Sequence, residues 1–395
     1  MDNEFKQDDQ VPEADIEIIL DDQENDMSNK TTLAPHKHFR KLRNKEPLTK
    51  KEKWIIGIEI AIIVIIIGLI CYILFKPTKT TTATIKKEPK ATVVPVIIKS
   101  RLTGLPVTAA QAALPVTGVM IENSDEARPQ SGLSQAGVVY EAIAEGGITR
   151  FLALYEEGQP SSLGPIRSAR PYYVDWLLPF DASYAHVGGS ADGLDAISTY
   201  KVKDLDQYYN GSSYTRISSR AAPHNVYTSM ANLLALEKSK GYATSTFTGF
   251  PRKADKPAAI PEATKVDFNI AGSDFEVHYD YNKLTNSYDR SEAGSPMVDA
   301  NTGKQLSPKV VIAIVVPISQ GALDASGAYY SEYADTGSGP AYIFQDGNVI
   351  VGTWSKSSPT AQIQFGDANG DPTALNAGQT WITAVSDSNL ITYTK

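Results

Sequence analysis

An apolar run of 22 residues, Trp54–Phe75, constrains this chain more than any other feature of its sequence. The run consists almost entirely of Ile, Val, Leu, Gly and Ala, and its only charged residue is Glu59, near the first end. About 20 apolar residues in a helix span the hydrocarbon core of a bilayer. The alternative is a helix buried in a globular core, but Ile60–Ile70 is apolar on every side. We therefore predict a transmembrane helix over residues 54–75.

The flanking charges predict the direction of this helix. Residues 36–53 contain eight Lys or Arg and two acidic residues, whereas residues 76–90 contain five Lys. Basic residues gather on the cytoplasmic side, so we expect a single-pass protein of the cytoplasmic membrane, with the N-terminus inside and the later domains outside. The run is longer than the core of a cleaved signal, which favours an uncleaved signal anchor. Ile70 stands before Cys71 where a lipoprotein signal has a small residue, which argues against lipidation.

Charge and composition divide the rest of the chain into segments. Residues 1–35 hold 11 acidic residues against two lysines, and are predicted to be a disordered acidic cytoplasmic tail. Residues 36–53 are a basic juxtamembrane segment, expected to lie on anionic lipid heads. Residues 76–100 are rich in Thr, Lys, Pro and Val and are predicted to be an extended linker. From residue 91 onward the chain contains 30 acidic and 22 basic residues. We predict no nucleic-acid partner, because phosphate binding needs a basic face.

The part beyond the membrane is predicted to hold two domains. Residues 101–250 alternate strand and helix patterns, which is typical of an α+β or α/β layer fold. Strands are predicted at 116–121, 136–144, 149–156 and 182–187, and helices at 168–178, 191–200 and 227–240. The last helix is expected to be capped by Thr228 or Asn225 and to end at Gly241.

A Pro- and Lys-rich linker, 251–263, precedes the second predicted domain. Residues 264–395 show short alternating runs without a convincing helix, so we expect mainly antiparallel β structure that can share a sheet with the first domain. Strands are predicted at 275–281, 310–316, 342–344, 349–354 and 381–385, with turns at Asp346-Gly347 and Asn369-Gly370.

Arginine, histidine and glycine gather in the loops of the first domain. A helix start presents unpaired N–H groups and a partial positive charge. Arginine adds a fork of donors that fits a carboxylate or phosphate, and glycine lets a ligand approach the backbone. If the loops converge, they form a pocket for a phosphate, carboxylate or sulfate group. The predicted ligand-binding residues are Arg128, Glu145, Arg150, Arg167, Ser168, Arg170, His186, Gly188, Gly189, Ser190 and His224.

Each of these residues also has a structural interpretation. The arginines can pair with nearby carboxylates such as Glu122 and Glu141, and the serines can cap helices. His186 or His224 is the candidate acid or base if the site is catalytic. No G-x-S-x-G, H-E-x-x-H or P-loop motif is present. The acidic turn at 367–371 departs from a calcium loop. We predict no metal and no cofactor.

Many spaced motifs across residues 100–395 resemble the YerB-like family of bacterial envelope lipoproteins. They include Leu102–Val107, Val119–Asn123, Ala127–Leu133, Val139–Glu141, Glu145–Phe151, Gly164–Arg170, His186–Ser190, Pro223–Asn225 and Leu375–Ile382. The resemblance implies an N-terminal and a C-terminal family domain on the outer side of the cytoplasmic membrane, and no established molecular function or catalytic residues. This sequence differs in that a transmembrane helix takes the place of the lipid anchor.

Three functions remain open from the sequence. The first is a membrane-anchored envelope protein that binds an anionic ligand such as a cell-wall polymer. The second is a hydrolase or transferase acting at the same site on wall glycan or its phosphodiester links. The third is a scaffold that recruits other envelope proteins and would show an exposed apolar patch.

Overall fold

Strands from both halves of the folded part combine in one ten-stranded mixed sheet. The computed structural model describes residues 50–76, 98–324 and 327–395; the predictions for the acidic tail, for 36–49 and for 77–97 of the linker lie outside these residues. The strands in spatial order are β20 (Gln364–Gly366), β19 (Asn348–Lys356), β18 (Gly337–Gln345), β15 (Val310–Val315), β22 (Thr380–Val385), β4 (Val138–Ile143), β5 (Thr149–Tyr155), β3 (Thr117–Glu122), β6 (Ser183–Ala185) and β7 (Lys203–Asp204).

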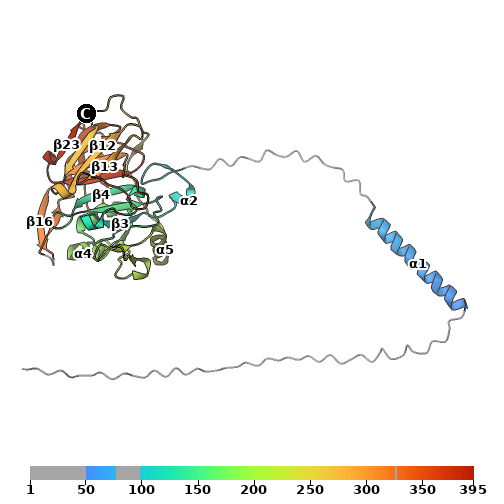
Figure 1. Cartoon of the computed structure of the whole chain (residues 1–395). Helices are drawn as coiled ribbons and strands as arrows, with labels where there is room; N and C mark the ends of the chain where they lie inside the picture. Colours follow the sequence, from blue (N-terminus) through green and yellow to red (C-terminus); the bar gives the residue numbers. More distant parts are fainter. Residues whose placement is uncertain (1–49, 77–97, 325–326) are drawn as a thin grey trace, which may run out of the picture. The chain divides into compact units, whose positions relative to one another are not determined.

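The two halves meet at β22, which pairs in parallel with β15 on one side and with β4 on the other. The two predicted domains thus contribute strands to one sheet, the arrangement that the sequence analysis left open. A second, antiparallel sheet contains β14 (Ser295–Pro296), β13 (Ser287–Glu292), β12 (Glu276–Asn282), β11 (Lys265–Asn269) and β23 (Ile391–Thr394), and lies beside the first sheet in Figure 1.

Within 98–324 and 327–395, four two-stranded ribbons complete the β structure. They are β1 (Ile98–Lys99) with β2 (Pro106–Val107), β8 (Thr215–Arg216) with β9 (Val226–Tyr227), β10 (Arg252–Lys253) with β21 (Leu375–Asn376), and β16 (Ile318–Leu323) with β17 (Tyr329–Tyr333). Among the described residues after 264 no α-helix is present. The Asp346-Gly347 turn joins β18 to β19 with positive φ at both residues, 60° and 78°, as its sequence predicts.

One α-helix, α1 (Lys50–Leu74), contains the apolar run except its last residue, Phe75. Four more α-helices occur among the described residues of the folded part: α2 (Ala109–Ala112), α3 (Pro171–Leu177), α4 (Ala191–Thr199) and α5 (Met230–Lys240). Within α1, Gly57–Leu74 is long and apolar enough to cross a membrane. Every side chain of that window is exposed to solvent where the structure describes it.

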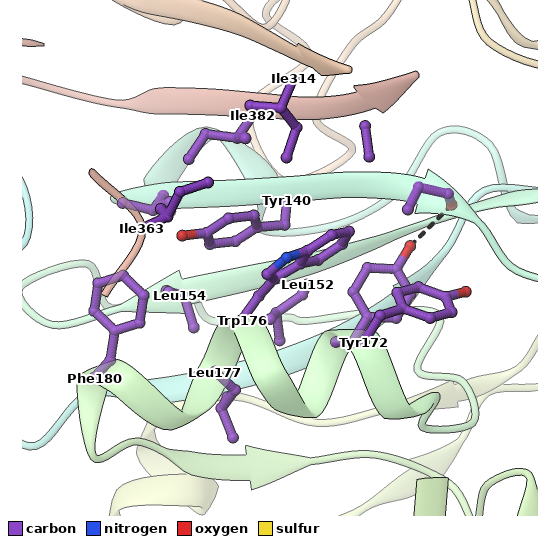
Figure 2. Packing of buried hydrophobic residues seen from close by; sticks show 14 of the residues in the cluster. Tyr140, Leu152, Leu154, Tyr172, Trp176, Leu177, Phe180, Ile314, Ile363 and Ile382 are labelled. Carbon is purple, nitrogen blue, oxygen red and sulfur yellow. Dashed lines mark hydrogen bonds between the residues drawn. The ribbon is translucent and has the colours of Figure 1, made fainter. Parts of the chain in front are cut away.

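The helices cover the two faces of the large sheet because its strands are apolar on both sides. Along β4, Tyr140 faces the core cluster that contains α3, whereas Val139 faces the cluster that contains α5. In Figure 2 the α3 side chain Trp176 points toward Tyr140 and Leu152 of the sheet. The rings of Tyr140 and Trp176 stack with their centroids 5.3 Å apart.

Two helix starts differ from the sequence-based predictions. The predicted helix at Ser168 begins at Pro171, because residues 164–167 continue the sheet: Arg167 N donates to Met120 O (2.9 Å) and Glu122 N to Pro165 O (2.9 Å). The cap of α5 is Ser229, and neither Thr228 nor Asn225, because Thr228 is bonded to Leu163 across a bridge. Gly241 ends α5 with φ 79°, as predicted.

A buried ion pair fastens the second sheet to the first. Glu141 of β4 and Arg290 of β13 have no exposed side-chain surface, and their Oε1 and Nη2 atoms are 2.8 Å apart. The other carboxylate oxygen of Glu141 accepts from Trp381 Nε1 (3.0 Å) and Thr383 Oγ1 (3.1 Å) of β22. Arg290 also donates to Tyr279 Oη (2.6 Å). Three strands therefore meet at one buried carboxylate.

A second buried polar group is the carboxyl group of Asp335, which lies just before β18 of the large sheet. Asp335 is 6% exposed, and its Oδ2 atom has no hydrogen-bond partner among the described residues. Burial and the neighbouring Asp175 raise the pKa of Asp335 to about 7, although Lys356 acts in the opposite direction. Burial also lowers the pKa of Lys356. Asp335 therefore holds a proton in the folded state to a much higher pH than a carboxyl group in water.

Candidate functional site

The loops singled out in the sequence lie side by side in the fold. Val187 N donates to Arg167 O (3.0 Å) and Ala169 N to Gly188 O (2.9 Å), so the segments 164–170 and 186–190 run next to each other. Ser131 and Gly164 form a bridge, and Glu122 and Arg150 are paired across β3 and β5. The backbone therefore brings the predicted segments together, and their side chains separate into four groups.

The first group is centred on Glu145, which accepts from two arginines. Arg170 donates to Glu145 Oε2 through Nε (3.0 Å) and Nη2 (2.6 Å), and Arg150 donates to Oε1. Arg150 also donates to the carbonyl of Ser168 (3.1 Å), so Ser168 joins the Glu145 group through its backbone. Tyr330 of β17 lies over the Arg170 guanidinium at 4.8 Å. Both arginine side chains are about 95% buried, at 4% and 5% exposure. Burial, together with the charge of Arg170, lowers the pKa of Arg150.

The second group, the Glu122 site, contains Glu122, Arg167, His224 and Ser124. Arg167 Nε lies 2.9 Å from Glu122 Oε1, and His224 Nδ1 lies 3.0 Å from the same oxygen. The N–H of Arg167 is poorly aligned for a hydrogen bond, so this contact is an ion pair. Ser124 Oγ donates to Oε1 as well, at 3.2 Å. The Glu122 side chain is 2% exposed, whereas those of Arg167 and His224 are 24% and 20% exposed.

Arg167 and His224 each contact Glu122 through one nitrogen of the side chain. Nη1 and Nη2 of Arg167 make no hydrogen bond to a described residue, and neither does His224 Nε2. A buried carboxylate thus holds an arginine through its inner nitrogen and a histidine through Nδ1. The forked end of the arginine and the second ring nitrogen are left for another partner.

The third group surrounds Arg128, which lines a pocket of about 380 Å³. Its guanidinium donates to Asp125 Oδ1 (2.8 Å), to Asn123 and to the carbonyl of Asp274 (2.9 Å), and lies 3.4 Å from Glu292. Pro296 and Met297 form apolar parts of the wall. The pocket contains two carboxylates and one arginine, so its charge disfavours an anion. Arg128 belongs to this pocket and is not part of the Glu122 site.

The fourth group holds His186 and the glycines that follow it. His186 is fully buried, with Nδ1 2.8 Å from Gly188 O and Nε2 3.0 Å from Asp204 Oδ1. Both ring nitrogens are occupied, so His186 has no free nitrogen to offer a ligand. Ser190 caps α4 by accepting from Gly193 N (3.2 Å), and Gly189 lies in a bridge with Ala169. In this structure these residues position the backbone.

Glu122 is the residue that sequence reasoning left out of the candidate set. It was considered only as a structural partner for an arginine, although it organises Arg167 and His224 together. The available signal was an acidic residue at the end of a strand that is otherwise apolar, Thr117–Glu122. A carboxylate in such a strand must find partners when it is buried. Glu122, Glu145, Arg150, Arg167 and Arg170 combine three arginines with two carboxylates, an excess of one positive charge before His224 is counted.

Two family models and a protein of Bacillus subtilis match the sequence of this chain. Residues 102–243 match the model described as Protein of unknown function (DUF3048) N-terminal domain, and residues 265–382 match its C-terminal domain. A protein of Bacillus subtilis (strain 168) named "Putative lipoprotein YerB" is 32% identical over 304 residues, which cover 75% of this chain and 89% of the relative.

A solved structure agrees with the sequence comparison. The crystal structure of the YerB protein from Bacillus subtilis matches with a TM-score of 0.67 and 29% identity, over 75% of this chain and 100% of that chain. The level of identity, the coverage of both chains and the two matching models confirm the resemblance seen in the sequence motifs. This chain belongs to the YerB-like family, defined by the N-terminal and C-terminal DUF3048 domains.

Proposed function

We propose that this chain is a membrane-anchored protein of the bacterial cell envelope that binds an anionic group at the Glu122 site. The observation that carries this proposal is the Arg167 guanidinium, which contacts a buried carboxylate through Nε while its Nη1 and Nη2 atoms make no hydrogen bond to a described residue. A guanidinium fork binds carboxylate or phosphate through two parallel hydrogen bonds. His224, on the same carboxylate oxygen, adds a second donor when it is protonated.

The anchor and its direction belong to the same proposal. α1 is the membrane span, the basic segment 36–53 lies in the cytoplasm, and residues 98–395 lie outside. The relative's printed name, a lipoprotein, describes a protein held to a membrane by lipid. A site on the outer side meets wall polymers, many of which carry phosphodiester groups. The charge excess around Glu122 and Glu145 favours such a polyanion.

Binding of poly(glycerol phosphate) to the full chain in lipid nanodiscs tests the proposal. Arg167→Gln is expected to weaken binding about tenfold, because a charge-assisted pair of hydrogen bonds is lost. The wild-type affinity should also fall as salt rises, since exposed charges are screened. Calorimetry or surface retention measures both effects.

Lys304→Gln is the matched control, because Lys304 is exposed and its side chain has no partner among the described residues. It removes the same charge from the whole protein and is expected to bind as the wild type does. Equal weakening by both variants would show that only net charge matters. Equal affinity of Arg167→Gln and the wild type would remove the Glu122 site from the proposal.

A second function, hydrolysis or transfer at a phosphodiester, is favoured by the Glu122–His224 pair. With Nδ1 donating to Glu122, the neutral ring keeps its lone pair on Nε2. As a general base, Nε2 takes a proton from water or from an acceptor hydroxyl while the oxygen attacks phosphorus. The P–O bond to the leaving alcohol breaks, and the leaving oxygen takes the proton.

Release of soluble phosphate esters from poly(glycerol phosphate) measures this activity. His224→Gln is expected to reduce release by at least about a hundredfold, because general-base catalysis contributes roughly 10²–10⁴. His278→Gln, in a half-buried pair with Asp267 away from the Glu122 site, is the control and should retain activity. Absence of release by the wild-type protein would leave the site with binding alone.

A further inference from the structure

The loop that follows β7 carries two strongly exposed aromatic side chains. Tyr208 is 71% exposed and Tyr209 is 83% exposed. Tyrosine in a folded protein usually buries most of its ring, since the ring provides a large apolar surface. Neighbouring exposed rings therefore mark a surface that contacts something other than water.

Tyr209 stands at a pocket of about 370 Å³, which we name the Tyr209 pocket. Ile197, which is 5% exposed, and Val202 give it an apolar base, and Leu194 of α4 adds an exposed apolar edge. Polar groups line the rest, among them Lys201, Asp204 and Asp206. The volume lies within the roughly 300–1,000 Å³ of small-ligand pockets. An apolar base with a few polar groups is also their usual composition.

The loop is held in place before any ligand arrives. Asp206 Oδ1 accepts from Gly188 N (2.9 Å) and Tyr208 N (3.2 Å), and its carbonyl accepts from Asn210 Nδ2 (2.7 Å). Gln207 N donates to the carbonyl of His186 (2.9 Å). A pre-ordered loop loses little conformational freedom on binding, which favours affinity.

Gly188 shows how closely the two loops pack. Its φ is 54°, and a Cβ atom at this position would lie 2.8 Å from Tyr208 Cε2. The positive φ therefore favours glycine, and a Cβ atom would also require the exposed Tyr208 ring to shift. This gives Gly188 and His186, both predicted to be ligand residues, a structural part in setting the Tyr209 pocket.

The charges of the pocket select against anions. Two carboxylates, Asp204 and Asp206, face a single lysine. Burial alone would raise the pKa of Asp204, but its hydrogen bond with His186, that residue's charge and the N–H of Asp206 bring the pKa below its ordinary value. Asp204 thus stays an ionised acceptor at neutral pH, with its side chain 37% exposed.

We propose that the Tyr209 pocket binds a neutral saccharide unit. The C–H face of a sugar ring carries a slight positive charge and stacks on the negative face of an aromatic ring such as Tyr209. Sugar hydroxyls donate to the Asp204 carboxylate and accept from Lys201 Nζ. The apolar base of the pocket takes a methyl or ring C–H group. This site is independent of the Glu122 site, whose chemistry suits an anion.

Saturation-transfer NMR on the full chain in lipid nanodiscs tests the proposal with two neutral probes, chitotetraose and maltotetraose. We expect transfer to the protons of at least one sugar. Tyr209→Ala is expected to weaken its binding roughly tenfold. Because Tyr209 is 83% exposed, the variant should unfold at the wild-type temperature.

Two controls separate the possible outcomes. Tyr329→Ala removes a ring that is 49% exposed on β17, outside the pocket, and should bind the sugar normally. Arg167→Gln should also bind it normally, which distinguishes this proposal from the anionic site. Absence of transfer from both sugars, or unchanged transfer in Tyr209→Ala, would overturn the proposal. Loss of sugar binding in Arg167→Gln would place the sugar at the Glu122 site and overturn it as well.

Discussion

Replacing Arg290 by methionine is expected to destabilise the fold by about 3–5 kcal/mol, because a buried carboxylate then loses its counter-charge. Glu141 and Arg290 are fully buried and 2.8 Å apart. Without the guanidinium, Glu141 keeps Trp381 Nε1 and Thr383 Oγ1 as donors, but no positive charge offsets its burial. The unfolding temperature of the full chain, followed by tryptophan fluorescence, measures the loss.

Two further variants show that the burial of charge is the cause. Glu141→Gln combined with Arg290→Met removes both charges, and we expect it to be clearly more stable than Arg290→Met alone. Lys265→Ala breaks an exposed pair with Asp280, in which both side chains are more than half exposed, and should cost less than about 1 kcal/mol. A double variant as unstable as Arg290→Met would mean that lost packing dominates.

The second large effect concerns pH. Asp335 has a pKa of about 7 in the folded protein, against an ordinary value of 3.8. Between these values the unfolded chain releases the proton and the folded chain keeps it, so stability falls as pH rises from about 4 to about 7. The full shift corresponds to an upper bound of about 4 kcal/mol. Glu237, with a pKa raised by burial to about 7, acts in the same direction.

Asp335→Asn is expected to remove the Asp335 share of this pH dependence, because asparagine resembles the protonated acid, whereas the Glu237 share remains. Its unfolding temperature should exceed that of the wild type at pH 8 and approach it at pH 4. Asp175 remains as a counter-charge for Lys356 in the variant. Asp371→Asn, at an exposed position, is the control and should match the wild type at both values. A variant that falls below the wild type at pH 8 would contradict the argument.

Much of the secondary structure could be predicted because strand patterns here are local. The predictions for 149–156, 310–316 and 381–385 lie within two residues of β5, β15 and β22, since each strand is a short apolar run between turn residues. The glycine pair Gly146-Gly147 takes positive φ in the hairpin between β4 and β5, and such a pair is itself a local turn signal. The ribbon β16–β17 was missed, because its strands are largely exposed and lack an apolar pattern.

Pairing between distant segments was the part that the sequence did not reveal. Nothing in the local pattern of Thr380–Val385 indicates that it lies parallel to both β4 and β15. The same limit applies to the site. Arginines and histidines near glycines could be recognised, but their division among Glu122, Glu145, Glu292 and Asp204 depends on the tertiary fold.

The position of β22 also bears on how the protein reaches its native state. Trp381 and its partner Glu141 are 240 positions apart in the chain, and until β22 arrives, β4 and β15 each present an open edge. Open edges recruit strands from other chains. The first family segment therefore cannot complete its sheet as it emerges, and assembly waits for β22. Contacts this remote make folding slow, so the newly made protein is most prone to aggregate until β22 has paired.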